Sequence, residues 1–239
     1  MSTTLLDIMK DLTYGEFAQL AIGNMIPGET ESEPDPENYE KLIRHINMGL
    51  TEIYKRFFLL SREVDIQQHE EISTYLLHSK YSVTVGTEPT LYVRDTIDEP
   101  FLDDILKIEE VYDEGGDKYF LNDVSEDLSL YTPSYRSIQV PYPDDDVTMS
   151  VQYRANHPKI IYAANMEPED TDVSVPNSLY EALLYYVASR VFASLGGDGG
   201  VESNDYFQRF ENSCRKVDEL GLEVQAEPGD WRFDTHGWV

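Results

Sequence analysis

Aspartates in acidic turns are the first candidates for chemically active residues. Asp104, Asp113 and Asp144 each lie in such a turn, and their carboxylates could bind a hard divalent cation. The run 144–146 is more typical of a solvated turn, because three adjacent side chains point in different directions and no Gly or Glu completes an EF-hand loop. A metal-dependent hydrolase that uses these carboxylates is therefore an alternative interpretation, and strong retention of calcium or manganese would favour it.

A glycine-rich loop and a single cysteine form the second group. The loop 196–200 follows a predicted helix and lacks the Lys and Ser/Thr of a P-loop, which is typical of a helix connection rather than a phosphate site. Cys214 falls on the apolar side of a predicted helix, where a small buried thiol is the simplest interpretation. One cysteine also excludes an internal disulfide.

The five histidines form the third group, and they show neither an HExxH motif nor a repeated metal-ligand spacing. They are His45, His69, His78, His157 and His236. No serine lies in a GxSxG elbow, and no acid–base pair can be chosen among 46 Asp and Glu residues without geometry. The sequence therefore predicts no catalytic residue, no metal ligand and no cofactor, and we expect a protein that is not an enzyme.

Charge and composition narrow the class of protein. The 239 residues carry 18 Lys and Arg against 46 Asp and Glu, a formal net charge of −28. Broad binding to nucleic acid or anionic lipid needs cationic side chains, so this balance argues against both. With 41% hydrophobic and 12% aromatic residues the chain can bury a core. No signal peptide and no run of roughly 18 apolar residues is present, which predicts a soluble protein made inside the cell.

Helices are predicted at both ends of the chain. Residues 3–22 are expected to form two short helices, followed by an exposed acidic linker over 27–37. A long amphipathic helix is predicted from about 36 to 58, because apolar residues recur there at spacings of three and four. Two further helices are predicted over 178–195 and 203–220. The first of these is apolar nearly all round, so it must be covered on several sides.

Strands are predicted in the middle of the chain. The clearest alternation of apolar and polar residues runs over 147–153. Ile105–Tyr112 is expected to pair with 118–121 across the turn 113–117, whose glycines permit the positive φ angles of a tight hairpin. A third candidate strand covers 135–140. These segments predict a small β-rich insertion with acidic turns.

Aromatic residues are the strongest functional signal, since the chain has 17 tyrosines and places both tryptophans in its last segment. Aromatic side chains supply large contact areas, which favours an assembling subunit over the alternative of a monomer with a rich core. We expect one contact through the C-terminal segment and another through the apolar helix. The residues expected at these contacts are Trp231, Arg232, Phe233 and Trp238 in the C-terminal segment, and Tyr185, Tyr186, Arg190 and Phe192 between subunits.

The order of elements resembles that of the head-to-tail adaptors of tailed bacteriophages, of the head completion or tail tubular A type. Those proteins are built around a helical bundle with a β-rich insertion and an extended C-terminal arm. The segments that carry the resemblance are DILKIEEVYDEGGD (104–117), YRANHPKI (153–160), PNSLYEALLYYVASRV (176–191) and NDYFQRFENSC (204–214). The resemblance covers 105–239 and extends to the first hundred residues by architecture alone.

This resemblance implies a virion protein of the phage neck that is made in the host cytoplasm. It implies a ring of about twelve copies beneath the portal, which continues the DNA channel toward the tail. The implied partners are the portal protein, tail or nozzle proteins and further copies of the chain. In such an adaptor, the C-terminal residues Trp231, Arg232, Phe233 and Trp238 would bind the portal. An acidic channel would repel the DNA backbone, so the genome would pass during packaging and ejection without specific binding. A monomeric module whose β domain binds a peptide or sugar is a further alternative.

The predicted fold class is α+β, mainly helical, with a long-helix bundle, a β-rich insertion and an extended C-terminal arm. The expected divisions are N-terminal helices with the acidic linker over 1–60, a β-rich insertion domain over 61–175, a helical hairpin that completes the bundle over 176–222, and the arm over 223–239.

Overall fold

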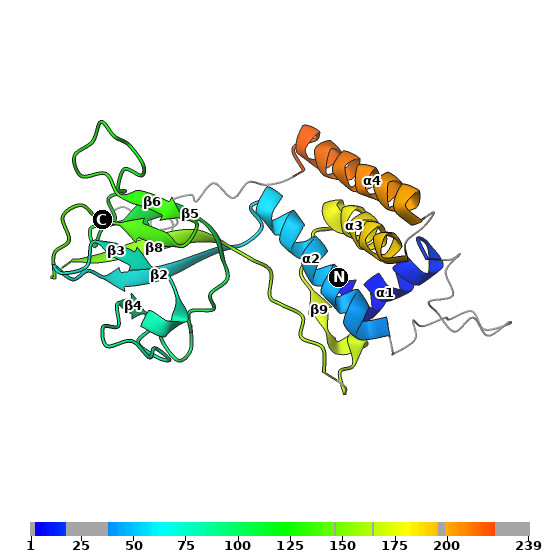
Figure 1. Cartoon of the computed structure of the whole chain (residues 1–239), viewed down its shortest axis with the longest axis horizontal. Coiled ribbons are helices and arrows are strands. Elements are labelled where there is room, and N and C mark those ends of the chain that lie inside the picture. Colours follow the sequence, from blue (N-terminus) through cyan, green and yellow to red (C-terminus); the bar gives the residue numbers. More distant parts are fainter. Residues whose placement is uncertain (1–2, 18–37, 146, 164, 196–198, 223–239) are drawn as a thin grey trace, which may run out of the picture. The chain divides into compact units, whose positions relative to one another are not determined.

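A computed structural model gives the fold of the chain as two units (Figure 1). The helical unit contains Met1–Phe57 and His157–Val239, and the β unit is the continuous stretch Phe58–Asn156. The residues that the structure describes are 3–17, 38–145, 147–163, 165–195 and 199–222. The predicted linker over 27–37 and the predicted arm over 223–239 lie outside these residues.

The predicted fold class is wrong, because strands make up far more of the protein than a mainly helical bundle allows. The described residues form four helices and nine strands, and the strands form three antiparallel sheets. Several strands are only two to four residues long. Such short segments leave almost no periodic signal in a sequence, whereas each long helix repeats its apolar pattern over several turns.

The helical unit contains all four helices and a small two-stranded sheet. Its elements are β1 (Thr3–Thr4), α1 (Leu5–Tyr14), α2 (Tyr39–Arg56), the 3-10 turn Pro168–Asp170, β9 (Asp172–Val173), α3 (Asn177–Leu195) and α4 (Gly199–Glu219). The long helix and the two later helices are thus confirmed. Between residues 3 and 17 only α1 forms, where the start of a second helix was expected.

Side chains at the N-terminus of α1 fix where this helix begins. Thr4 and Asp7 form a capping box, in which the Thr4 hydroxyl accepts a hydrogen bond from the Asp7 amide at 3.2 Å. In return, the Asp7 carboxylate accepts one from the Thr4 amide at 3.0 Å, which lowers the pKa of Asp7. Leu5, Ile8 and Leu12 are then buried along one face, so α1 joins the core of the unit.

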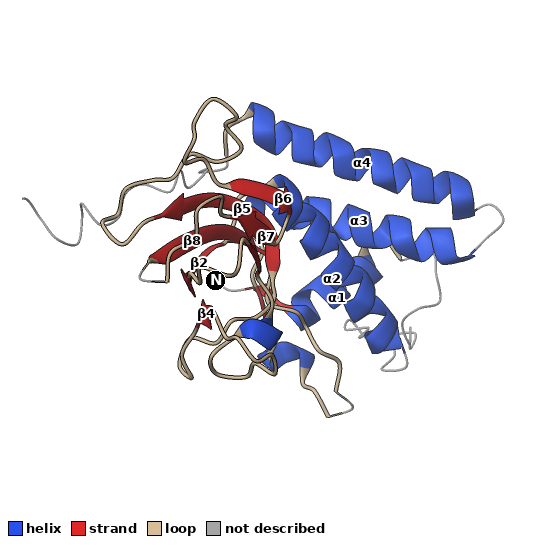
Figure 2. Ribbon diagram, turned by 60° about the vertical axis from the view of Figure 1, so that its left-hand side comes forward, coloured by secondary structure: helices blue, strands red, loops and turns tan. Residues whose placement is uncertain are grey.

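Helix α3 lies at the centre of the helical unit, and Figure 2 shows it between α2 and α4. At its crossing with α2 the backbones approach closely. A Cβ added at Gly49 of α2 would lie 2.7 Å from Leu183 Cδ1 and 3.1 Å from Tyr186 Cδ1, so this crossing has no room for a larger residue without movement. Most of the apolar side chains of α3 are buried within the unit, among them Leu179, Leu183 and Val187.

The segment that returns from the β unit is anchored to α2. The Asn47 side chain donates to the carbonyl oxygen of Ile160 at 2.9 Å and accepts from its amide at 3.0 Å. His157 is buried, with Nδ1 2.9 Å from the Pro158 carbonyl oxygen and Nε2 3.1 Å from that of Asn47. Tyr54 meets the imidazole edge-on at a centroid separation of 5.8 Å.

Burial of His157 predicts a loss of stability in mild acid. Burial lowers the pKa of this imidazole, more than the two carbonyl oxygens raise it, so between the two pKa values the unfolded chain binds more protons than the folded one. We therefore expect the contribution of His157 to the free energy of unfolding to be complete above the unfolded histidine pKa of about 6.5. Below that pH the contribution should decrease as the pH falls toward the lower pKa of the folded state. Urea unfolding of wild type and of His157→Gln between pH 8 and pH 5.5 tests this. Equal slopes against pH in the two proteins would contradict it.

The β unit contains a four-stranded and a three-stranded antiparallel sheet. The first has the order β4-β2-β8-β5 and the second the order β3-β7-β6. Their strands are β2 (Ser61–Gln67), β3 (Thr74–Leu76), β4 (Val93–Arg94), β5 (Ile105–Tyr112), β6 (Tyr131–Ser134), β7 (Ser137–Gln139) and β8 (Thr148–Ala155). β5 and β8 confirm two of the predicted strands. The hairpin is only partly formed, since Gly116 has a φ of 88° but 118–121 contains no strand and Lys118 makes only an isolated bridge to Tyr112.

The core of the β unit joins apolar positions of its strands to a group of tyrosines. β2 and β8 place Val64 opposite Val151, and both are buried. Tyr92 meets Tyr75 edge-on at 5.1 Å and stacks on Tyr81 at 4.6 Å. Its hydroxyl donates to the Leu76 carbonyl oxygen and accepts from the Leu76 amide, so a large polar aromatic is buried with its hydrogen bonds satisfied. Burial raises the pKa of Tyr92.

Candidate functional site

The four residues expected between subunits all lie on α3, but they face in two directions. Tyr186 is only 7% exposed and packs on Phe210 of α4, with ring centroids 5.1 Å apart. Phe192 is 5% exposed and stacks on Tyr206 of α4 at 5.2 Å. These two side chains therefore belong to the core of the helical unit.

Tyr185 and Arg190 lie at the surface of the same helix. Tyr185 is partly exposed, and its hydroxyl donates to Glu181 Oε1 at 2.7 Å. This hydrogen bond, together with burial, raises the pKa of Tyr185 to about 12. Arg190 is exposed. The structure thus brings Tyr186 and Phe192 together with α4 inside the unit and leaves Tyr185 and Arg190 available to other molecules.

An aromatic and cationic cluster on the outer side of α3 and α4 surrounds Tyr185. The Arg209 guanidinium lies over the Tyr206 ring at 5.1 Å and over the Tyr185 ring at 5.9 Å. The two tyrosine rings are 6.3 Å apart. We name Tyr185, Tyr206 and Arg209 the α3–α4 cluster. Tyrosine and arginine are the residue types most often found at the energetic centre of protein interfaces, so the cluster suits contact with another protein.

Outside its buried seam, α4 carries exposed apolar side chains. The helix buries a single seam against its neighbours, formed by Phe210, Ser213, Cys214 and Val217. Outside that seam, Val201 is 68% exposed and Phe207 41% exposed. A helix of 21 residues that buries one narrow seam leaves most of its surface for a partner.

The buried seam of α4 is held in place by a cation from α2. Arg56 forms an ion pair with both carboxylate oxygens of Glu211, one of them at 2.9 Å, and its guanidinium lies 4.8 Å from the centroid of Phe210. The hydrogen bond from Arg56 lowers the pKa of Glu211. These contacts join the end of α2 to the middle of α4, and residues 155 positions apart in the chain supply them.

Loss of the Arg56 contact is expected to weaken the helical unit measurably. Because both partners are about one-third exposed, we expect Arg56→Ala to lower the free energy of unfolding by only about 1 kcal/mol. Arg215→Ala is the matched control, since Arg215 pairs with Glu219 at 3.6 Å where both side chains are two-thirds exposed. Urea unfolding of the two variants should separate them. Equal losses of unfolding free energy in the two variants would show that the bidentate geometry of the Arg56–Glu211 pair adds no stability.

The carboxylates of the hydrolase alternative do not gather into one site. Asp104 forms an ion pair with Arg62 at 3.2 Å and accepts from the Tyr153 hydroxyl at 3.1 Å. Asp113 accepts from the amide of Asp117 within its own turn. Among the described residues, no group of three or more His, Cys, Asp or Glu side chains could hold a metal ion.

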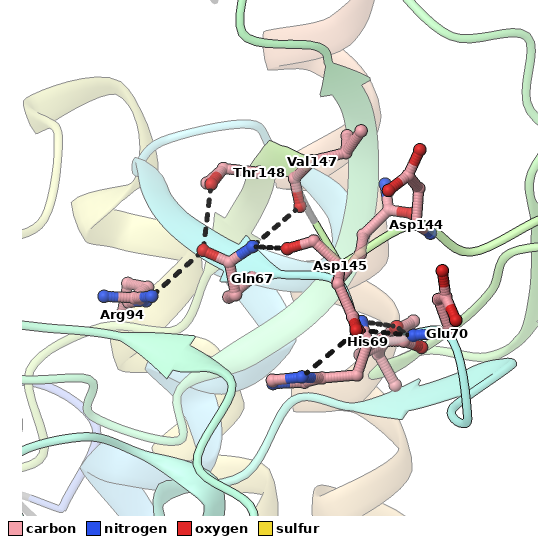
Figure 3. A network of polar contacts seen from close by, with 10 residues as sticks. Gln67, His69, Glu70, Arg94, Asp144, Asp145, Val147 and Thr148 are labelled. Atoms are coloured by element: carbon pink, nitrogen blue, oxygen red, sulfur yellow. Dashed lines mark hydrogen bonds and ion pairs between the residues drawn. The ribbon is translucent and has the colours of Figure 1, made fainter.

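The acidic turn beside Asp144 is instead part of a polar network that closes a loop onto β2 (Figure 3). Gln67 Nε2 donates to the Asp145 carbonyl oxygen at 2.8 Å, and Gln67 Oε1 accepts from Arg94 at 2.9 Å. The Asp145 carboxylate accepts from the Glu70 amide at 2.7 Å and lies 3.7 Å from His69 Nδ1. These bonds position the turn, which agrees with a structural role for its carboxylates.

Sequence reasoning missed Tyr206 and Arg209 as members of a surface cluster. Their spacing of three on a predicted helix was the available signal, because residues three apart lie on the same helical face. Their partner Tyr185 comes from α3, and pairing across two helices depends on the rotation of each. Trp231, Arg232, Phe233 and Trp238, the residues expected to bind the portal, lie outside the described residues.

Comparisons with known proteins give no family for this chain. Neither the search of protein-family models nor the search of curated proteins found a match. Within the described parts of the chain, none of the helices has the length and apolar character needed to cross a membrane. The candidate functional site is therefore defined by its own geometry: the α3–α4 cluster and the exposed apolar side chains of α4.

Proposed function

We propose that this chain is a non-enzymatic structural adaptor of a bacteriophage neck. In this role, copies of the chain form a ring that joins the portal to the tail and extends the DNA channel. The observation that carries the proposal is the surface of α4 outside its buried seam, which exposes Val201 and Phe207 and also carries Tyr206 and Arg209 of the α3–α4 cluster. A neighbouring copy in a ring would cover such a surface.

Two further features support the same proposal. The element order follows the adaptor pattern on which the resemblance rests, with a β unit inserted between α2 and a pair of helices, α3 and α4. The net charge of −28 is also suited to a conduit, because carboxylates that line a channel would repel the DNA backbone. The proposed partners are the portal protein, tail or nozzle proteins and further copies of the chain.

Ring formation on the portal tests the proposal directly. Purified protein would be mixed with the portal protein of the same phage and imaged in negative stain, where an adaptor gives rings on one portal face. Val201→Asp together with Phe207→Asp should abolish these rings, because each places a charge at an exposed position of α4. Phe207 borders the buried seam, with its ring 5.9 Å from that of Phe210, so circular dichroism must first show that the double variant is folded. Val124→Asp is the matched control in the β unit, where Val124 is 88% exposed.

The outcomes separate the parts of the proposal. Absence of rings from wild type would reject the adaptor function, and full rings from the folded double variant would reject the α4 surface as the subunit contact.

Replacing Trp231 and Trp238 with alanine should remove portal attachment, because aromatic anchors dominate many interfaces. Fluorescence anisotropy at low salt should show no micromolar binding of duplex DNA, and such binding would count against an acidic conduit.

A further inference from the structure

The segments on either side of β4 expose four aliphatic side chains of the β unit. These are Val83, Val85, Ile97 and Leu102, which we name the Asp95 patch. Single exposed aliphatic residues are common on protein surfaces, so exposure alone does not mark a binding site. These four differ from scattered residues because one carboxylate, that of Asp95, holds together the parts of the chain that carry them.

Asp95 joins two segments that lie apart in the sequence. Its carboxylate accepts hydrogen bonds from the Thr84 amide and from the Phe101 amide, each at 3.1 Å. The Thr84 hydroxyl donates a third at 2.5 Å. Two residues of the patch flank Thr84, one follows Phe101, and one lies two residues after Asp95. All four therefore lie within two residues of the groups that meet at this carboxylate.

The backbone that carries the patch is fixed by its own hydrogen bonds. Ser82 is fully buried, and its carbonyl oxygen accepts from the Gly86 amide at 2.9 Å. Beyond β4, the Thr96 hydroxyl accepts from the Glu99 amide at 3.0 Å and closes a loop of four residues. Ile97 lies inside this loop and is 89% exposed, so it makes no buried contact that would explain an isoleucine where polar turn residues are favoured. The loops thus hold the patch out in solvent.

The sheet edge beside the patch is already occupied. β4 is an edge strand, and edge strands with free backbone groups invite the addition of a strand from another chain. Here the Val93 carbonyl oxygen accepts from the Val83 amide at 2.9 Å, and Ser82 forms a bridge with Val93. A partner at this place must therefore contact side chains rather than extend the sheet.

The rim of the patch is acidic. Residues 95–104 contain five Asp and Glu and no Lys or Arg. The carboxylates of this run that are exposed belong to Asp98, Glu99 and Asp103. Arg94, just before the run, donates to Gln67 at 2.9 Å. Charges of opposite sign favour association and like charges oppose it, so the rim suits a cationic partner. A second copy of a chain with a net charge of −28 does not meet that requirement.

We infer that the Asp95 patch is a docking surface for a cationic amphipathic segment of a different protein. Aliphatic side chains of that segment pack on Val85, Ile97 and Leu102, and its Lys or Arg side chains pair with Asp98 and Glu99. The inference does not rest on the adaptor function, because it uses neither α4 nor the α3–α4 cluster.

Titration of the full-length protein with a peptide of six Lys-Leu repeats tests the surface, with the methyl groups observed by NMR. The signals of Val85 and Ile97 should shift saturably. Val85→Ser together with Ile97→Ser should weaken binding about tenfold, because apolar contacts are lost without a change of charge. Val124→Ser is the matched control, since Val124 is 88% exposed beside Asp123 in another acidic loop of the β unit, and it should leave binding unchanged.

The acidic rim has a test of its own. Asp98→Asn together with Glu99→Gln should weaken peptide binding about threefold, as expected for exposed ion pairs, and should reduce its dependence on salt. Glu126→Gln together with Asp127→Asn removes the same charge elsewhere in the β unit and should leave binding unchanged. Equal losses in the two double variants would mean that the peptide responds to net charge alone, which would overturn the inference.

Sedimentation velocity of the protein alone tests the identity of the occupant. No self-association that depends on Ile97 is expected across a concentration series. Self-association that Ile97→Ser abolishes would make a second copy the occupant and contradict the inference. Equal affinity of the peptide for wild type and for the folded Val85 and Ile97 double variant would contradict it as well, because the patch would then contribute nothing to binding.

Discussion

Tyr186→Asp is expected to unfold the helical unit. The ring of Tyr186 lies between Gly49 of α2 and Phe210 of α4 and is almost completely buried. Truncating a buried aromatic costs about 3–5 kcal/mol, and burying a carboxylate without a partner adds to that cost. The sum is comparable to the whole stability of a domain, which is about 5–15 kcal/mol. Phe192→Asp should act in the same way, since Phe192 lies against Tyr206 and Phe17.

Tyr185→Asp is the matched control, because it places the same charge one position away on the same helix. Tyr185 is partly exposed, so we expect a folded protein that has lost its ring contact with Arg209. Hydrogen exchange measured by mass spectrometry would locate the effect, with protection lost across α2, α3 and α4 only in Tyr186→Asp. Wild-type protection in a Tyr186→Asp protein would show that this side chain is not a core residue.

The contrast between Tyr185 and Tyr186 shows how much of the site the sequence could predict. The position and length of α3 followed from its apolar residues, and so did the need to cover it on several sides. Which molecule covers it did not follow, because adjacent residues on a helix point about 100° apart and both are tyrosines. The cover comes from α1 and α2, more than 120 positions earlier in the chain, and from α4.

The cationic side chains of α2 also show which contacts a sequence can predict and which it cannot. Arg44 and Lys55 pair with Glu40 and Glu52 at spacings of four and three, which a helical sequence predicts directly. Arg56 instead pairs with Glu211, and only the packing of α4 on α2 brings those two residues together. Lys41 forms no ion pair with a carboxylate among the described residues, and its Nζ lies 3.1 Å from Ser194 Oγ of α3.

The strands that the sequence did not predict explain why the predicted fold class is wrong. β2 reads Ser-Arg-Glu-Val-Asp-Ile-Gln, so only Val64 and Ile66 mark its buried face. β6 and β7 are shorter and rich in Ser and Thr or Gln. What makes β2 a strand is its full-length pairing with β8, which lies more than eighty positions later in the chain. Long-range pairing of this kind leaves no local periodicity to find.

Gly86→Ala is expected to destabilise the β unit by about 3 kcal/mol, because overpacking of this kind forces backbone shifts. A Cβ added at this position would overlap the carbonyl oxygen of Ser82 and Leu91 Cδ2, and would lie 2.9 Å from the carbonyl oxygen of Lys80. The two carbonyl groups cannot simply move away. Gly86 donates its amide to the Ser82 oxygen at 2.9 Å, and Thr87 donates to the Lys80 oxygen at 2.9 Å.

Movement of this loop would also reach the aromatic core. Tyr81 lies between Lys80 and Ser82 in the chain and stacks on the buried ring of Tyr92, so a shift of either neighbour would disturb this ring pair. Gly200→Ala is the control and should have the opposite sign, since a Cβ there would meet no atom within 4 Å and alanine favours a helix by up to about 1 kcal/mol over glycine. Urea unfolding gives the size of both effects, and hydrogen exchange of β2 and β4 locates the first. A Gly86→Ala protein as stable as wild type would show that the loop can open without cost.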